Sequence, residues 1–309
     1  MAVPARFGGL PPLVSGVLAL LVQGRVRLVE DNYASSLAPF DLHLARFDMA
    51  ERAFALRGLF EWRIAAIASI VLTPGDTVFE GGAQLGTETF NYCALVGHGG
   101  QVVTYEADPG LAARLANEAE RLGRSECRVQ AKALGAQPGT ALFEVASVEA
   151  WGSENSGLGS LAPNDSPRDG RIAVDVATLD DAFTDFGAPA MVVLDIQGGE
   201  LGALRGASRV LQEARPVIVL EVESGSLARL GGSAEELFAL LTSADYDCWR
   251  MTRFGLRRIE RPRTDELGDW LVVPRERPEE LLTRIRSALW RGAVTPPQSR
   301  FSPLARLRT

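Results

Sequence analysis

Residues 76–86 read Asp76-Thr77-Val78-Phe79-Glu80-Gly81-Gly82-Ala83-Gln84-Leu85-Gly86. A short apolar run ends here in a carboxylate, and a glycine turn follows. A second apolar run, residues 101–106, reads Gln101-Val102-Val103-Thr104-Tyr105-Glu106 and ends in another carboxylate. Strand, glycine turn, helix and strand in this order predict a parallel sheet that binds a nucleoside-bearing cofactor. The glycines would let the backbone approach the ligand, and the second carboxylate suits two ribose hydroxyls.

The spacing of the glycines indicates which cofactor. A dinucleotide fingerprint has Gly-x-Gly-x-x-Gly, with the pyrophosphate at a helix N-terminus. Here Glu80 comes first, and three residues separate Gly82 from Gly86. A carboxylate beside the turn would repel a pyrophosphate but attract a cation, such as the α-amino group of a methionine moiety. The pattern therefore favours S-adenosylmethionine over NAD; an ordinary strand–helix turn without a ligand is the other alternative.

Composition narrows the class of protein. The chain has 309 residues and 46% hydrophobic residues, enough for one large α/β domain with additions or for two small domains. Its net charge of −7 argues against nucleic acid as the partner. Cys93, Cys127 and Cys248 lie far apart without a Cys-x-x-Cys pair, so we expect neither a zinc site nor a disulfide framework. These cysteines fit the reducing cytoplasm.

The ends of the chain differ in character from its middle. Residues 13–22 are apolar, but a membrane span needs about twenty such residues. No small-x-small cleavage site follows, so we expect a short helix that packs on the domain or on a second subunit, as in a homodimer; a weak membrane-surface role is the lesser alternative. We expect a helical N-terminal extension over 1–70, the cofactor domain over 71–275, and a helix with a loose tail over 276–309.

Between these ends, strand and helix patterns alternate, which predicts a parallel sheet covered on both faces. We expect strands at 77–80, 101–106, 128–133, 172–176, 190–196 and 216–223, and an antiparallel pair at 246–251 and 269–273. Helices are expected at 50–71, 86–96, 108–122, 179–186, 199–211 and 234–243. A hairpin-like insertion follows residue 137, and the polar stretch 150–170 is expected to be a lid-like loop. Its Trp151, Asn155 and Ser156 would contact substrate or face solvent.

Three segments together resemble the FkbM-type S-adenosylmethionine-dependent methyltransferases: residues 72–86, 103–109 and 194–201, the last followed by 204–207 and 220–223. The resemblance covers roughly residues 58–273. It implies an α/β, Rossmann-like class I methyltransferase with a seven-stranded, mostly parallel sheet and helices on both faces. It also implies an O-methyltransferase that acts on a hydroxyl or carboxyl of a small molecule or glycan.

The resemblance also assigns site residues by position. Glu80, Gly82 and Gly86 would line the methionine end of the cofactor, Glu106 would bind the ribose, and Asp195 would lie near the sulfonium and the acceptor. Lys132 and Ala133 would pass near the adenine. The remaining expected cofactor contacts are Glu61, Gly81, Gln84 and Ala107.

Four positions depart from the family pattern. The family usually has Asp at Glu80, Asn at Gln84, Glu at Gln197 and Ala at Gly199. The first two side chains are one methylene longer, and the third loses a charge near the expected acceptor. The departures indicate an unusual substrate or, as the alternative function, a non-catalytic binding or partner protein on the same fold.

Methyl transfer requires alignment of the acceptor and exclusion of water, and a base can take the acceptor proton. Asp195, at the end of a central strand, is the first catalytic candidate and Glu200 the second; Glu221 and Glu223 come third. Asp195 could equally cap a helix or orient a ligand, and Glu200 could favour the helix dipole. His43 would be a rival base if its segment folds over the pocket, whereas His98 reads as a loop residue. Asp195, Glu200 and Glu221 could gather magnesium, but paired acids do not require it, so we predict no metal.

Overall fold

The computed structural model describes residues 61–145, 159–163, 170–252, 255–277 and 279–294, and the backbone of three short strands before them. These strands, β1 (Val26–Val29), β2 (Asn32–Ser35) and β3 (Asp41–Leu42), form an antiparallel sheet. The expectation of a mostly helical extension is therefore wrong for this stretch, where valine and tyrosine favour extended backbone. The expected helix at 13–22, the homodimer contact assigned to this segment, and His43 lie outside the described residues.

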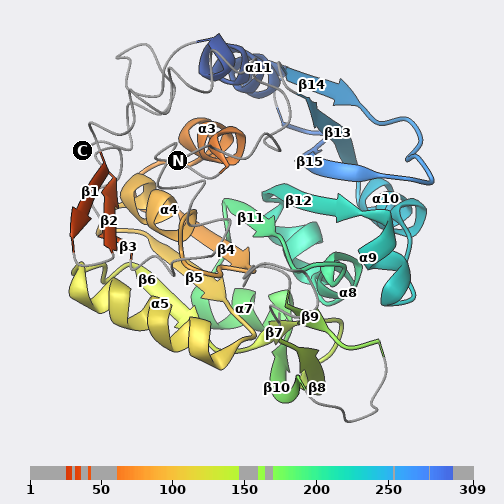
Figure 1. Ribbon diagram of the computed structural model, residues 1–309. Coiled ribbons are helices and arrows are strands. Elements are labelled where there is room, and N and C mark those ends of the chain that lie inside the picture. The colour runs from red at the N-terminus through yellow and green to blue at the C-terminus, as the bar shows by residue number, and fades with distance from the viewer. Residues whose placement is uncertain are drawn as a thin grey trace, which may run out of the picture.

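An eight-stranded sheet forms the centre, in the order β14-β13-β15-β12-β11-β4-β5-β6 (Figure 1). Its parallel half consists of β4 (Thr77–Gly81), β5 (Gln101–Tyr105), β6 (Cys127–Gln130), β11 (Met191–Leu194) and β12 (Val217–Glu223). The antiparallel edge consists of β15 (Leu267–Pro274), β13 (Tyr246–Thr252) and β14 (Gly255–Arg258). The Rossmann-like sheet and its antiparallel closing pair are confirmed, and β14 adds an eighth strand to the expected seven.

Helices cover both faces of this sheet, as expected (Figure 1). One apolar core joins it to α3 (Trp62–Val71), α4 (Thr89–Val96) and α11 (Glu279–Val294). The other core joins it to α7 (Leu179–Phe186), α8 (Glu200–Arg205), α9 (Ser224–Arg229) and α10 (Ala234–Ser243). Because α3 and α11 share a core with the central strands, these two flanking helices belong to the same packed unit as residues 71–275.

A second, four-stranded sheet lies beside the carboxyl end of the first, in the order β7-β10-β8-β9. It contains β7 (Ala133–Leu134), β8 (Gly139–Glu144), β9 (Ser160–Leu161) and β10 (Arg171–Ala177). The insertion expected after residue 137 is not a local hairpin, because β10 lies between β7 and β8 and pairs with β8 in antiparallel orientation.

Two expectations are corrected by this second sheet. The strand expected at 128–133 ends at Gln130, because Ala133 pairs with Val176 of β10 instead. The expected lid loop contains β9, since Leu161 pairs with Phe143 of β8. Most of that loop, including Trp151, Asn155 and Ser156, lies outside the described residues.

The helix expected over 199–211 is shorter than predicted. α8 ends at Arg205, and a Cβ atom on Gly206 would stand 2.3 Å from the Gly135 carbonyl oxygen. That close contact demands glycine, which is a poor helix former. A π-helical turn, η2 (Val210–Ala214), follows. Among the described helices, none combines the length and apolarity needed to cross a bilayer.

Candidate functional site

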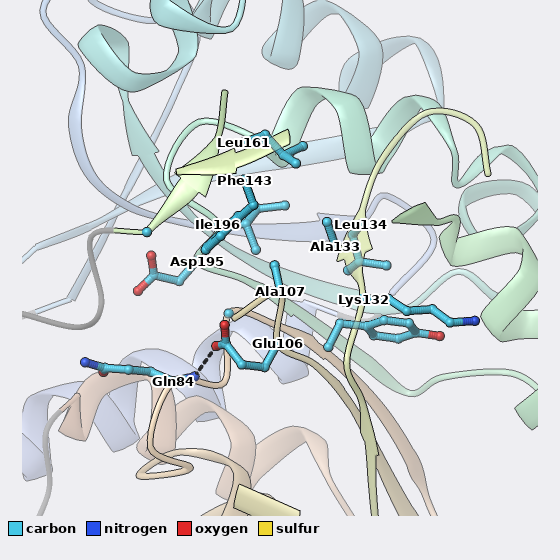
Figure 2. Close-up of a pocket in the computed structure, with 14 residues that line it drawn as sticks. Gln84, Glu106, Ala107, Lys132, Ala133, Leu134, Phe143, Leu161, Asp195 and Ile196 are labelled. Atoms are coloured by element: carbon cyan, nitrogen blue, oxygen red, sulfur yellow. Dashed lines mark hydrogen bonds between the residues drawn. The ribbon is translucent and has the colours of Figure 1, made fainter. Parts of the chain in front are cut away.

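A pocket opens where β4, β5 and β11 end, which is where open α/β sheets bind ligands. One part of its wall is polar and includes Glu106 and Asp195. The other part is apolar, and Figure 2 shows it on the side of β8 and β9. The apolar wall consists of Leu134, Phe143, Leu161 and Ile196.

Glu106 directly follows β5 and is 6% exposed. Its Oε2 atom accepts a hydrogen bond from the Gln84 backbone N–H at 2.8 Å, and its Oε1 atom accepts one from Asp108 at 2.8 Å. Burial raises the pKa of this carboxyl, and the backbone donors counteract that rise. Figure 2 shows the bond that joins Glu106 to the turn after β4. The carboxylate is therefore held in place between that turn and the start of α5 (Pro109–Arg121).

The glycines after β4 serve the packing of the chain itself. Gly82 has a φ of +86°, and a Cβ atom there would stand 1.8 Å from the Asp195 carbonyl oxygen. Gly86 has a φ of +80°, and its Cβ would meet Leu115 at 2.4 Å. Of the three expected glycines, Gly82 lines the pocket, whereas Gly81 and Gly86 do not. The close approach that requires glycine at position 82 is thus to the β11 loop.

Glu80 is not brought to the pocket. Alternate residues of a strand face opposite sides of the sheet, and Val78 belongs to the core under α3 and α4. Glu80 shares that side, where Thr89 of α4 donates a hydrogen bond to its Oε2 atom at 2.6 Å. Burial raises its pKa to about 7. Of the two carboxylates expected to grip one ligand, Glu106 therefore lines this pocket and Glu80 does not.

Glu61 precedes α3 and also stands apart from the pocket wall. Its backbone N–H donates to Glu88 Oε1 at 3.4 Å. Burial, and then the neighbouring carboxylate Asp269, raise the pKa of Glu61 well above its ordinary value. Arg63 lies 3.4 Å from Asp269 and contributes positive charge to this acidic group.

The loop after β11 carries Asp195, which is exposed and lines the pocket. The side-chain Nε2 of Gln197 donates to Asp195 Oδ1 at 2.8 Å and to Glu221 Oε2 at 2.7 Å. Glu200, 1% exposed, accepts at Oε1 from the backbone N–H groups of Ile196 at 3.0 Å and Gly198 at 3.3 Å. Burial raises the pKa of Glu200 to about 7. The structure therefore places Glu200 as a brace for this loop and not in the pocket.

Gln84, Ala107, Lys132 and Ala133, the other expected cofactor contacts, line the pocket. Figure 2 shows the Lys132 side chain directed to the side opposite Asp195. Sequence reasoning missed the apolar wall. The alternation of Ala141, Phe143 and Val145 was an available signal, because it places Phe143 on one face of a strand.

His98 is not part of the pocket wall. His98 has an 85% exposed side chain, and its Nδ1 atom lies 3.7 Å from Glu126. Within the part of the chain that the structure describes, no three His, Cys, Asp or Glu side chains are grouped so that they could hold a metal ion.

The family model for the methyltransferase FkbM domain matches residues 80–248. Among solved structures, a methyltransferase FkbM from Methylobacillus flagellatus is similar with 19% identity and a TM-score of 0.39, covering 64% of this chain and 43% of its own. This chain thus spans less than half of that protein. An O-methyltransferase from Bacillus cereus in complex with SAH has 11% identity and a TM-score of 0.36, covering 88% and 84%. An rRNA methylase from Streptococcus thermophilus has 11% identity and a TM-score of 0.36, covering 68% and 91%. No curated protein matches the chain.

Proposed function

Because this chain belongs to the FkbM methyltransferase domain family, we propose that it is an S-adenosylmethionine-dependent O-methyltransferase. The acceptor in this proposal is a hydroxyl or carboxyl oxygen of a small molecule or glycan. The observation that carries the proposal is the pocket at the ends of β4, β5 and β11, where a fixed carboxylate and an apolar wall lie on either side of one cavity.

The chemistry of the pocket fits a nucleoside with a charged tail. A carboxylate offers about four acceptor sites, so Glu106 retains capacity for two ribose hydroxyls beyond its backbone partners. Leu134, Phe143 and Leu161 form an apolar surface suited to an adenine ring, beside Ala133. Asp195 supplies negative charge elsewhere on the wall, which suits a sulfonium. Gln84 and Ala107 contribute backbone beside the ribose position.

The bound donor supplies an activated methyl group, so the protein needs to orient the acceptor and remove its proton. Asp195 is the group proposed for proton removal, because it is the exposed carboxylate of the pocket wall. Glu200 holds the loop that carries Asp195, through the amides of Ile196 and Gly198. We assign Glu200 a positioning role.

The ribose assignment is tested by Glu106→Ala. We expect the free energy of S-adenosylmethionine binding to weaken by about 1–3 kcal/mol, since the ribose hydroxyls lose a charged partner. Calorimetry with S-adenosylmethionine, S-adenosylhomocysteine and NAD measures this effect and the choice of cofactor. Glu120→Ala, which removes an exposed carboxylate of α5, is the control. Unchanged affinity in Glu106→Ala would refute the ribose assignment, and tighter binding of NAD would refute the choice of donor.

The role of Asp195 is tested by Asp195→Asn. This change preserves shape but removes the basic oxygen, so turnover should fall by about 100-fold or more while donor affinity changes much less. Production of S-adenosylhomocysteine with a panel of hydroxylated and carboxylated acceptors gives the rate. An undiminished rate would remove Asp195 from the mechanism, and a wild-type protein that binds the donor but methylates no acceptor would favour a binding protein.

A further inference from the structure

Glu221 stands next to Asp195 but belongs to a different strand. β11 and β12 are parallel neighbours, with Leu194 opposite Leu220, so the next residue on each strand is one of the two acids. The Gln197 amide joins them, with Nε2 at 2.8 Å from Asp195 Oδ1 and 2.7 Å from Glu221 Oε2. One side-chain amide thus bridges the Asp195 carboxyl group, which lines the pocket, and the Glu221 carboxyl group, which does not.

The surroundings of Glu221 are unusually negative. Asp269 of β15 lies opposite it in the sheet register, and Glu61 contributes charge from the start of α3. Arg63 is the described cation beside this group, at 3.4 Å from Asp269. Burial, then Asp195 and Asp269, raise the pKa of Glu221 far above its ordinary range. Because one amide nitrogen lies within hydrogen-bond distance of both carboxyl groups, the two groups are close enough for a single proton to be shared between them.

We propose that Glu221 and Asp195 act as one proton-sharing pair that takes the acceptor proton, and that Gln197 is the positioning residue that holds the pair together. This inference rests on the proposed function. Glu221 acts through Asp195, because Asp195 is the member of the pair that lines the pocket.

The backbone of Gln197 has a left-handed conformation, which is uncommon for a residue other than glycine. Its φ is +51°, in the left-handed region, and Arg229 Nη2 donates to its carbonyl oxygen at 3.1 Å. Gly198 follows with a φ of +101°. This geometry turns the Gln197 side chain back over the ends of both strands. An amide N–H₂ can donate to two carboxyl groups, whereas a carboxylate at the same position could donate to neither.

The protons balance without an additional reactant. The resting pair carries one proton and one negative charge. When the acceptor O–H bond breaks, its electron pair stays on the acceptor oxygen and the proton goes to the pair, which then holds two. Release of one proton to water restores the resting state.

The test uses binding, so it does not depend on a known acceptor. S-adenosylmethionine carries a positive sulfonium, and S-adenosylhomocysteine has a neutral sulfur at that place. A sulfonium beside Asp195 should favour loss of the shared proton. The ratio of the two affinities should therefore rise with pH, by at most about tenfold per pH unit when one proton is released. Calorimetry in buffers of different ionisation enthalpy should detect that proton.

Four variants separate the pair from its surroundings. In Glu221→Gln and Asp195→Asn no proton is shared, so the affinity ratio should become independent of pH. In Gln197→Glu a third carboxylate replaces the side-chain amide that donates to the pair, and the rise of the affinity ratio should move to higher pH. Glu235→Gln, which changes an exposed acid of α10, should behave as wild type.

The outcomes distinguish the two proposals. A wild-type protein that binds neither ligand overturns the proposed function, and this inference with it. Binding of both ligands with the wild-type pH dependence preserved in Glu221→Gln overturns the proton-sharing pair alone. A Gln197→Glu profile identical to wild type overturns the positioning role of Gln197.

Discussion

Gly82 combines a φ of +86° with a position from which a Cβ atom would stand 1.8 Å from the Asp195 carbonyl oxygen. Gly82→Ala should therefore lower the free energy of unfolding by about 3 kcal/mol or more, since backbone strain adds to overpacking. Gly75→Ala is the matched control, because Gly75 has a φ of +96° but nothing within 4 Å of its Cβ position. That variant should lose only about 1–2 kcal/mol. Denaturant unfolding measures both, and equal losses would show that the contact with Asp195 is not what requires glycine.

The start of α5 links an element to the pocket. Asp108 Oδ1 caps the helix through Gly110 at 2.7 Å and Leu111 at 3.2 Å, while the Asp108 backbone N–H holds Glu106. Asp108→Ala should cost about 1 kcal/mol of stability and leave donor affinity nearly unchanged, because the backbone donor remains. Ser233→Ala removes the comparable cap of α10, which bonds Glu236. Denaturant unfolding should show a similar loss of stability in the two variants, and calorimetry should show nearly unchanged donor affinity in both. A selective loss of affinity in Asp108→Ala would mean that the cap itself orders the site.

At the scale of the whole molecule, many carboxyl groups favour their protonated form in the folded state. A carboxyl group whose pKa is higher in the folded than in the unfolded state binds its proton more tightly in the folded protein. Its contribution to stability is therefore full below pH ~4.5 and is lost as pH rises through the folded-state pKa. Glu80, Glu88 and Glu200 have pKa values raised to about 7, mainly by burial. The thermal midpoint should therefore be highest near pH ~5 and fall towards pH ~8. Calorimetric scans across this range check the prediction, and a midpoint that rises instead would contradict it. The carboxyl groups with raised pKa values are Glu61, Glu80, Glu88, Glu106, Glu200, Glu221 and Asp269.

Local patterns made much of the fold predictable. Asp108 followed by Pro109 marked the start of α5, and the helix expected at 234–243 matches α10 residue for residue. Apolar runs that end in acids located β5 and β11, and hence Glu106 and Asp195 at the pocket. These features depend on residues close together in the chain, where capping, periodicity and strand length act directly.

Other parts of the site depend on contacts between distant segments. The side of the sheet that Glu80 faces was decided by which alternate residues of β4 pack on α4, and the end of β6 by the pairing of Ala133 with β10. The apolar wall likewise needs β8 and β9 to fold back over the pocket. Short-range signals carry no information on such pairings.

The order of strands, turns and capping residues along the chain was enough to specify a Rossmann-like sheet and the edge at which its ligand site lies, because these depend on local backbone preferences. Only the packed molecule decided that Glu80 leaves that site, that Glu200 braces a loop, and that Gln197 joins Asp195 to Glu221. Each of those outcomes depends on burial and distance between residues that the chain separates, and such distances exist only after the layers have come together.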